Sequence, residues 1–328
     1  MRAYADMLRV RHRPFLDRVR PSRGLPEVVV YPFSGGDLLA ALTVFPAAAE
    51  ITTLSLEHGG DPRALLGLSG GELEEQLSLL RRAVQSTFRV AHSTTRALDQ
   101  LEESALPAPL ALALVALVVH DQEPVSLRYL RLASDGSVRY LDTDEIARQE
   151  SRRAPPLREG RRPAFSPAFS HLELRFRARG GHGPLRTYRH LAANLEDSHL
   201  RQWPGLLRHL RAKGRVAAMT KAASYLLWRE RFSTVRDYLL SQADWIICDS
   251  SGPPLREALA AGLEVRSFGS YHGAFLPGVP RLHDLELQAF WQTGPHRPLP
   301  FRFGYPDRQR KAHLLIMARR GLLAEELR

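Results

Sequence analysis

A strand, a short turn, a helix and a second strand follow one another near the start of the chain. The β-branched run Val28–Val30 leads into a turn at residues 34–37, an apolar segment of helical length then reaches Phe45, and a strand-like run ends at Glu57. This β–turn–α–β unit constrains the fold more than any other stretch, because it begins a layered α/β arrangement.

The turn of this unit carries the residue types of a nucleotide-binding loop. Glycines let the backbone approach a ligand, and an acid about twenty residues later can hold the two hydroxyls of a ribose. Gly35 and Glu57 have that spacing. The motif is shorter than G-x-G-x-x-G and follows Pro32, so a tight turn in which Asp37 caps its own helix is the alternative. The predicted cofactor-binding residues are Ser34, Gly35, Gly36, Asp37 and Glu57.

Strand-like and helical patterns alternate along the rest of the chain. They predict an α/β fold with a mixed, mainly parallel sheet of the Rossmann or methyltransferase-like type and helices on both faces. Residues 1–26 are interpreted as an N-terminal arm and residues 27–328 as a single α/β domain. A β-hairpin insertion is expected at about 122–192, with a loop rich in Pro and Arg at about 146–168.

Three local expectations matter for the site. The apolar run Leu110–Val119 is about half a membrane span, which favours a buried strand or core helix. Residues Met219–Trp228 are predicted to form a helix. The segments Pro300–Tyr305 and Ala312–Ala318 are predicted to be an antiparallel pair of strands.

The net charge of +11 favours acidic partners, but its composition argues against a specific nucleic-acid site. Nearly all the basic residues are Arg, which is typical of a GC-rich genome, and they are scattered among acids. No stripe of alternating basic and aromatic residues occurs, so we expect at most weak, salt-sensitive binding of nucleic acid. The densest basic stretch, Arg152–Arg162, is interpreted as a solvated linker.

The single cysteine, Cys248, excludes an intrachain disulfide framework and a cysteine-based zinc site. Met1–Arg20 lacks the continuous apolar region that export needs, so we expect a cytoplasmic protein with no membrane anchor. Thirteen histidines include no H-x-x-x-H or H-E-x-x-H pair, and no metal is predicted. The oligomeric state stays open.

Two residues that follow apolar strands are the predicted catalytic groups. Asp249 comes directly after the run Trp245–Cys248, and His272 follows the run Val265–Phe268. Loops at the carboxyl ends of strands collect ligand contacts in α/β sheets, so Asp249 is a candidate general base and His272 a group that titrates near neutral pH. The alternatives are an N-cap for Asp249 and a structural role for His272. Lys221 is a further candidate base, or a partly exposed residue at a helix start.

Three groups of motifs resemble a bacterial protein family with no known activity. They are YPFSGGD with FP at 31–37 and 45–46, TKAASYLL with FSTVRDYLL at 220–227 and 232–240, and CDSSGPP with FGSYHG at 248–254 and 268–273. Similar proteins have YPFSGPD, KSASYLL and QDDSGIP at these places, and the resemblance covers roughly residues 28–318. This chain has Gly36 where the pattern has Pro and Ser250 where it has a second Asp, which weakens a paired-carboxylate mechanism here.

Two functions fit these features. The first is an enzyme, or degenerate enzyme, that binds S-adenosylmethionine or another adenosine nucleotide in a methyltransferase-like site, with a small-molecule ligand. The second is a non-catalytic α/β scaffold that binds a protein or acidic partner through its arginines. A deep pocket lined by Gly35, Asp37 and Glu57 favours the enzyme, whereas a closed turn in which Asp37 caps its own helix favours the scaffold.

Overall fold

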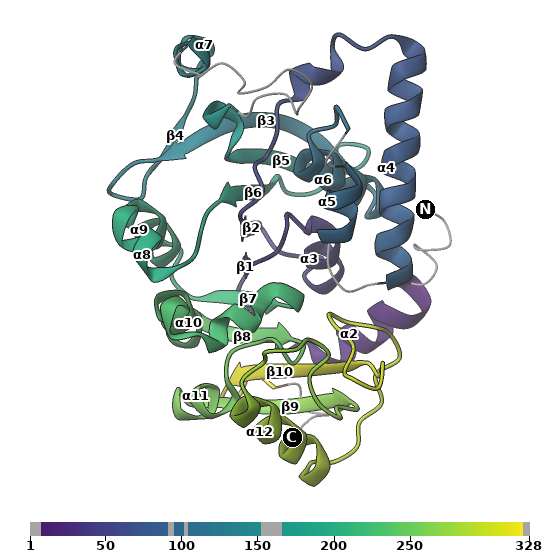
Figure 1. The fold of residues 1–328 in the computed structure, drawn as a ribbon, viewed down its shortest axis with the longest axis vertical. Helices are drawn as coiled ribbons and strands as arrows, with labels where there is room; N and C mark the ends of the chain where they lie inside the picture. Colours follow the sequence, from purple (N-terminus) through teal and green to yellow (C-terminus); the bar gives the residue numbers. More distant parts are fainter. Residues whose placement is uncertain (1–7, 91–94, 102–103, 152–165, 324–328) are drawn as a thin grey trace.

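One sheet of ten strands organises the chain (Figure 1). The computed structural model describes residues 8–90, 95–101, 104–151 and 166–323. The spatial order of the strands is β4-β3-β5-β6-β2-β1-β7-β8-β10-β9. The strands are β1 (Val28–Pro32), β2 (Glu50–Ser55), β3 (Gln122–Leu132), β4 (Val138–Tyr140), β5 (Leu172–Ala178), β6 (Arg186–Ala192), β7 (Val216–Thr220), β8 (Ala243–Cys248), β9 (Leu263–Gly269) and β10 (His313–Arg319).

The centre of the sheet is parallel and its two sides are antiparallel. Neighbouring strands from β6 to β8, in the order β6-β2-β1-β7-β8, all pair in parallel. The remaining pairs, which include β10 with both β8 and β9, are antiparallel. The α/β class and the mixed sheet are as predicted. The sheet is not mainly parallel, however, because hairpin-type connections extend it on one side and a reversed strand extends it on the other.

Helices cover both faces of this sheet. In Figure 1, α2, α3 and α6 lie to the right of the strands and α8 to α11 to the left. The helices are α2 (Arg13–Val19), α3 (Leu38–Val44), α4 (Gly70–Val90), α5 (Thr95–Leu101), α6 (Ala108–Val119), α7 (Thr143–Ser151), α8 (Asp197–Gln202), α9 (Pro204–Ala212), α10 (Ser233–Gln242), α11 (Leu255–Ala260) and α12 (Arg281–Thr293). Short helical turns are η1 (Leu8–His12), η2 (Pro62–Leu65), η3 (Pro167–Phe169), η4 (Ala222–Trp228) and η5 (Glu230–Phe232).

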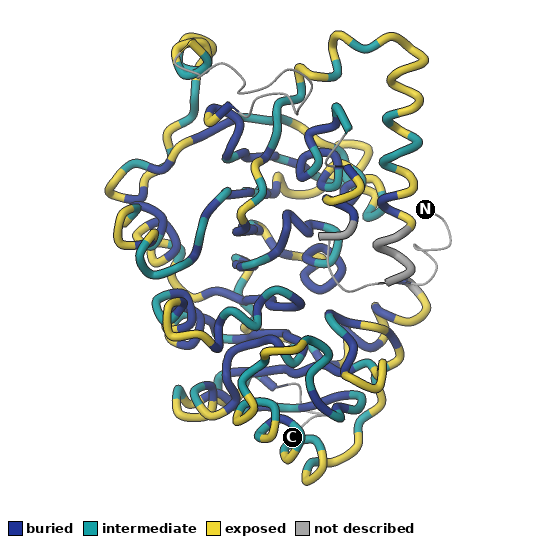
Figure 2. Tube along the Cα trace, viewed as in Figure 1, coloured by how far each residue is buried: buried dark blue, intermediate teal, exposed yellow. Residues whose placement is uncertain are grey.

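Side chains that point alternately to the two faces of the central strands divide the core into two layers. Val29 and Tyr31 pack with α2, α3 and α6, whereas Val30 packs on the opposite face with α9, α10 and α11. Successive side chains of a strand point to opposite faces, so a strand covered on both sides is apolar throughout. Figure 2 accordingly shows the central strands as buried. The apolar run after Pro107 forms the core helix α6, which is one of the two expected alternatives.

The N-terminal segment is packed onto this body. Phe15 and Val19 of α2 are buried, and the Phe15 ring makes edge-to-face contacts with Phe268 at 5.1 Å and Phe301 at 5.4 Å between centroids. Such contacts add to the stabilisation from apolar burial. Part of the predicted arm is therefore a helix that contributes to the core.

Two local predictions differ from the structure. Met219–Trp228 is helical only in part: Met219 and Thr220 complete strand β7, which is buried throughout, and Ala222–Trp228 forms the 3₁₀ helix η4. Burial in the centre of a sheet overrides the helix propensity of an alanine-rich segment. Pro300–Tyr305 is not a strand, because β10 already has β8 and β9 on its two sides. Its backbone binds a buried carboxylate instead, as described below.

The expected hairpin insertion is shorter than predicted at its carboxyl end. β5 and β6 do form an antiparallel pair, but β6 also pairs in parallel with β2 and so belongs to the central sheet. The predicted Pro/Arg-rich loop begins within α7, and its residues 152–165 lie outside the described part of the chain. Among the described helices, none combines the length and the apolar character needed to cross a bilayer.

Candidate ligand-binding site

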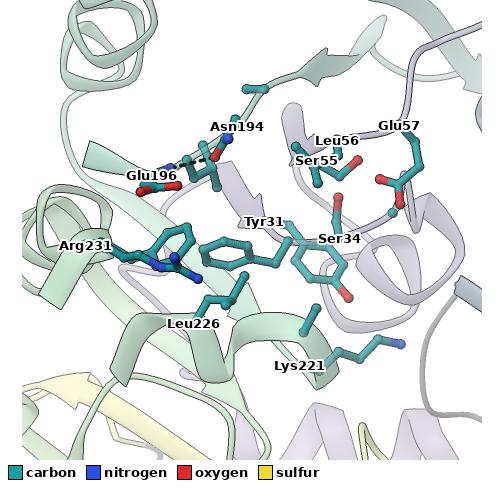
Figure 3. Close-up of a pocket in the computed structure, with 16 residues that line it drawn as sticks. Tyr31, Ser34, Ser55, Leu56, Glu57, Asn194, Glu196, Lys221, Leu226 and Arg231 are labelled. Carbon is teal, nitrogen blue, oxygen red and sulfur yellow. Dashed lines mark hydrogen bonds between the residues drawn. The ribbon is translucent and has the colours of Figure 1, made fainter. Parts of the chain in front are cut away.

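A cavity of about 290 Å³ opens where the chain changes direction across the sheet. In the sheet, β1 lies between β2 and β7. The chain reaches β2 from β1 through α3 on one face, and it reaches β7 from β6 through α8 and α9 on the opposite face. Ligands of α/β sheets bind at such a switch point, outside the carboxyl ends of the strands. The lining residues lie at the carboxyl ends of β1 and β2 and in the segments that follow β1, β2, β6 and β7. They are Tyr31, Phe33, Ser34, Gly35, Ser55, Leu56, Glu57, Ala193, Asn194, Leu195, Glu196, Lys221, Ala223, Leu226, Arg231 and Phe232 (Figure 3).

The turn after β1 has a left-handed backbone. Phe33, Gly35 and Gly36 have φ values of 56°, 57° and 73°. A positive φ is costly for an aromatic residue, and such conformations concentrate at functional sites. The amide of Ser34 donates to Leu54 O at 3.1 Å and the amide of Asp37 to Ser34 O at 3.2 Å. These two N–H groups therefore have partners within the protein.

Gly36 is favoured by its left-handed conformation, and its surroundings leave little room for a side chain. A Cβ atom at this position would lie 3.3 Å from Pro109 Cβ and 3.6 Å from His190 Nδ1. Proline, which the resembled motif has here, is fixed near φ −65° and cannot adopt the observed 73°. A proline at position 36 would therefore require a different turn.

Asp37 and Lys221 form a buried ion pair beside the cavity. Asp37 Oδ1 accepts a hydrogen bond from the amide of Ala40 at 3.0 Å, and Oδ2 lies 2.7 Å from Lys221 Nζ. The side chains are only 3% and 9% exposed. Lys221 lines the cavity but Asp37 does not. Asp37 is therefore the cap of α3, which is the alternative considered for it, and Lys221 is not an exposed residue at a helix start.

Two oxygen atoms at the end of β2 are buried without a protein partner. They are Ser55 Oγ and Glu57 Oε2, and both residues line the cavity. Figure 3 shows the side-chain oxygens of Ser34, Ser55 and Glu57 gathered at one side of the pocket. A buried polar atom without a partner costs about 1–3 kcal/mol. A ligand could remove this cost, because the Glu57 carboxylate can accept a hydrogen bond from it and the Ser55 hydroxyl can accept or donate one.

A hydrogen-bond network beneath the site joins the turn to Glu57. His190 Nε2 donates to Glu57 O at 2.7 Å, which leaves Nδ1 to accept from Thr53 Oγ1 at 3.1 Å in the neutral ring. Tyr188 Oη lies 3.0 Å from Thr53 Oγ1 and 3.3 Å from Gly36 O. Complete burial lowers the pKa of His190, which keeps this ring neutral. Two side chains of β6 therefore hold the site in place: His190 positions Glu57, and Tyr188 positions the turn at Gly36.

The remaining walls come from segments that the sequence did not suggest. Asn194 and Glu196 follow β6, and Phe232 faces Phe33 in an edge-to-face contact at 5.8 Å. Apolar side chains with a few polar groups are typical of a small-molecule site. Sequence reasoning missed Asn194 and Glu196 because it assigned β6 to a hairpin. Treating residues 186–192 as a parallel strand would have placed the loop after it at this edge.

Asp249 lies outside the cavity and is completely buried. Its Oδ2 accepts from the amides of Ala222 at 2.9 Å and Tyr305 at 2.8 Å, and its Oδ1 accepts from the amide and the hydroxyl of Ser251. A Cβ atom on Gly304 would lie 1.9 Å from Oδ2, so this carboxylate is tightly enclosed. Its surroundings favour a structural role, and a catalytic role stays a prediction.

His272 also lies away from the cavity. Its Nδ1 is 2.7 Å from Asp307 Oδ2, and its amide donates to the same oxygen at 2.9 Å. The side chain is 40% exposed. Asp249 and His272 both anchor the loop before β10, Asp249 through Tyr305 and His272 through Asp307. The structure therefore brings the two predicted catalytic residues to one loop but not to the predicted cofactor turn.

Ser34, Gly35 and Glu57 are the predicted site residues that line the cavity, with Gly36 and Asp37 packed behind it. In the described part of the chain, no three His, Cys, Asp or Glu side chains are arranged to hold a metal ion. Comparison of the sequence with models of protein families gave no match, and comparisons with curated proteins and with solved structures gave none either.

Proposed function

We propose that this cavity binds an adenosine-bearing ligand, with S-adenosylmethionine as the favoured example, in a methyltransferase-like site. The observation that carries the proposal is the pair of unpartnered buried oxygens, Ser55 Oγ and Glu57 Oε2, in a cavity that also contains Gly35 of the β1 turn. A carboxylate at the end of the second strand is where nucleotide-binding sheets hold ribose hydroxyls.

The strand order supports this assignment. Numbered by their place along the chain, the five parallel strands have the order 3-2-1-4-5, which is that of dinucleotide-binding sheets. The reversed strand β10 between β8 and β9 is a feature of methyltransferase-like sheets. Fold by itself does not determine function, so the strand order only adds to the argument from the site.

The turn favours a ligand without a phosphate at this point. The Asp37 carboxylate already accepts a hydrogen bond at the start of α3, where a nucleotide-binding site would place a phosphate. The Ser34 and Asp37 amides have protein partners. Asp37 takes the place that a phosphate would occupy at the start of this helix, so a nucleoside whose 5′ substituent is not phosphorylated fits the turn better. This argument favours S-adenosylmethionine over an adenosine nucleotide.

Calorimetric titration with S-adenosylmethionine, S-adenosylhomocysteine and ATP tests the proposal. The first two ligands should bind more tightly than ATP. Glu57→Gln should weaken their binding at least tenfold, because hydrogen bonds to a charged acceptor contribute about 1.5–3 kcal/mol. Glu27→Gln, an exposed acid before β1 at the opposite edge of the sheet, is the matched control and should bind normally. Equal binding by both variants, or no binding by the wild type, contradicts the proposal.

One observation favours the scaffold as a second candidate. Asp37 caps its own helix and is paired with Lys221, so this acid is committed to the fold rather than to a ligand. The scaffold would be favoured if the wild type bound none of the adenosine ligands and the Glu57→Gln variant folded as the wild type does. A cytoplasmic location and the lack of a specific nucleic-acid partner stay predictions.

A further inference from the structure

A second cavity, of about 170 Å³, lies in the loop between α12 and β10. Two arginines contribute to its wall, together with a phenylalanine and small residues. The lining residues are Arg302, Phe303, Gly304, Pro306, Arg310 and Ala312. Neither arginine takes part in the site described above.

The positive charge of this loop is not neutralised. Among the residues that the structure describes, no carboxylate lies within ion-pair distance of Arg302, Arg308, Arg310 or Lys311. Residues 296–312 contain a single acid, Asp307. That side chain is completely buried and lies 2.7 Å from His272 Nδ1. The loop therefore presents four cations without an acidic partner among the described residues.

Asp307 gives the loop a defined shape. Its Oδ1 accepts from the amides of Gln309 at 2.9 Å and Lys311 at 2.7 Å, while Oδ2 accepts from the amide of His272 at 2.9 Å. These bonds close a tight turn around the carboxylate. The basic side chains on the turn are consequently carried by an ordered backbone, which is what a binding site requires.

Arg310 stands where glycine would be the less strained residue. Its φ is 63°, a left-handed conformation that is unfavourable for a residue with a long side chain. Its guanidinium lies over the Phe275 ring, 4.5 Å from the centroid, and this contact orients the side chain. Strained residues of this kind concentrate at functional sites. An oriented arginine kept at a strained position points to a role for its charge.

We propose that this cavity is an oxyanion site that binds a phosphate-bearing small molecule through Arg302 and Arg310. Guanidinium groups match phosphate and carboxylate oxygens in fork-like geometry, and four nearby cations favour the anion of higher charge. One contact links the two cavities, since the centroid of the Phe303 ring lies 6.0 Å from Lys221 Nζ. The proposal rests on the cations of this loop and is independent of the adenosine ligand.

Thermal unfolding of the full chain in phosphate and in chloride of equal ionic strength tests this site. Inorganic phosphate, glycerol phosphate and acetate are the probes, and the dependence of Tm on their concentration gives the dissociation constants. We expect both phosphates to raise the Tm of the wild type more than acetate does. Glycerol phosphate should bind at least as tightly as inorganic phosphate if the ligand is a phosphate ester.

The variant Arg302→Gln/Arg310→Gly should weaken phosphate binding at least tenfold. Its Tm in chloride should stay level or rise, because glycine relieves the strained φ at position 310. The control Arg23→Gln/Arg320→Gln removes the same charge from exposed positions at the opposite edge of the sheet and should bind phosphate as the wild type does. Equal weakening in the two variants, or no specific effect of phosphate on the wild type, would overturn the proposal.

Discussion

Replacement of Asp249 by Asn should destabilise the fold strongly. This carboxylate holds three segments together, since its oxygens accept from Ala222 after β7, from Ser251 after β8 and from Tyr305 before β10. The side chain is completely buried. Asparagine has the same shape but only one accepting oxygen, so its amide nitrogen must face protein N–H donors.

The magnitude follows from the number of donors left without an acceptor. If the amide nitrogen takes the Oδ2 position, the Ala222 and Tyr305 amides both lose their partner. Each hydrogen bond to a charged group contributes about 1.5–3 kcal/mol, so the loss is about 3–6 kcal/mol. The variant no longer buries a charge, which reduces the loss toward the lower end of that range. A change of about 3 kcal/mol is large against a total stability of about 5–15 kcal/mol.

Urea unfolding followed by circular dichroism measures this difference. The m-value of Asp249→Asn should match that of the wild type, so the whole change is one of stability. The control is Asp237→Asn, an exposed acid on α10, which should change stability by less than about 0.5 kcal/mol. A loss below about 1 kcal/mol would refute the reasoning. If such a stable variant also lost an activity, the catalytic role expected from the sequence would be favoured instead.

Three further outcomes are expected. Burial lowers the pKa of four histidines to about 4, so as the pH falls the unfolded chain binds protons at these residues before the folded chain does. The stability present above about pH 6.5 should therefore be lost toward pH 4, by roughly 1.4 kcal/mol per pH unit for each histidine. Urea midpoints across this range measure the loss, and a flat profile would contradict the lowered pKa values. The four are His12, His120, His171 and His209. Asp37→Ala should lower the free energy of unfolding by about 3 kcal/mol, because Lys221 loses its buried partner; loss of a helix cap alone would cost roughly 1 kcal/mol. The double variant Asp37→Ala/Lys221→Met removes both charges and should recover part of the loss. Gly36→Pro should lower stability by more than about 1 kcal/mol in the same urea assay, because proline cannot adopt a φ of 73°. An unchanged urea midpoint would mean that the turn differs from the one described.

The sequence by itself determined the elements whose signals are local. The strand, turn, helix and second strand at 28–57 follow from β-branched and apolar runs separated by glycines, and each was found where the pattern placed it. The spacing of Gly35 and Glu57 was also sufficient to place both at one edge of the sheet. A strand, its turn and the next strand are constrained by neighbours in the chain, which is why short patterns were informative here.

Only the tertiary structure decided the rest of the site. The predicted helix Met219–Trp228 begins inside the central strand Val216–Thr220, because pairing with β1 and β8 buries that strand on both faces. The wall after β6 could not be placed without knowing that β6 pairs with β2, more than a hundred residues earlier. The burial of Asp249 depends on Gly304 and Tyr305, which lie more than fifty residues later in the chain. Pairing and burial of this kind are set by contacts between distant segments, and such contacts leave no periodic signal in the sequence.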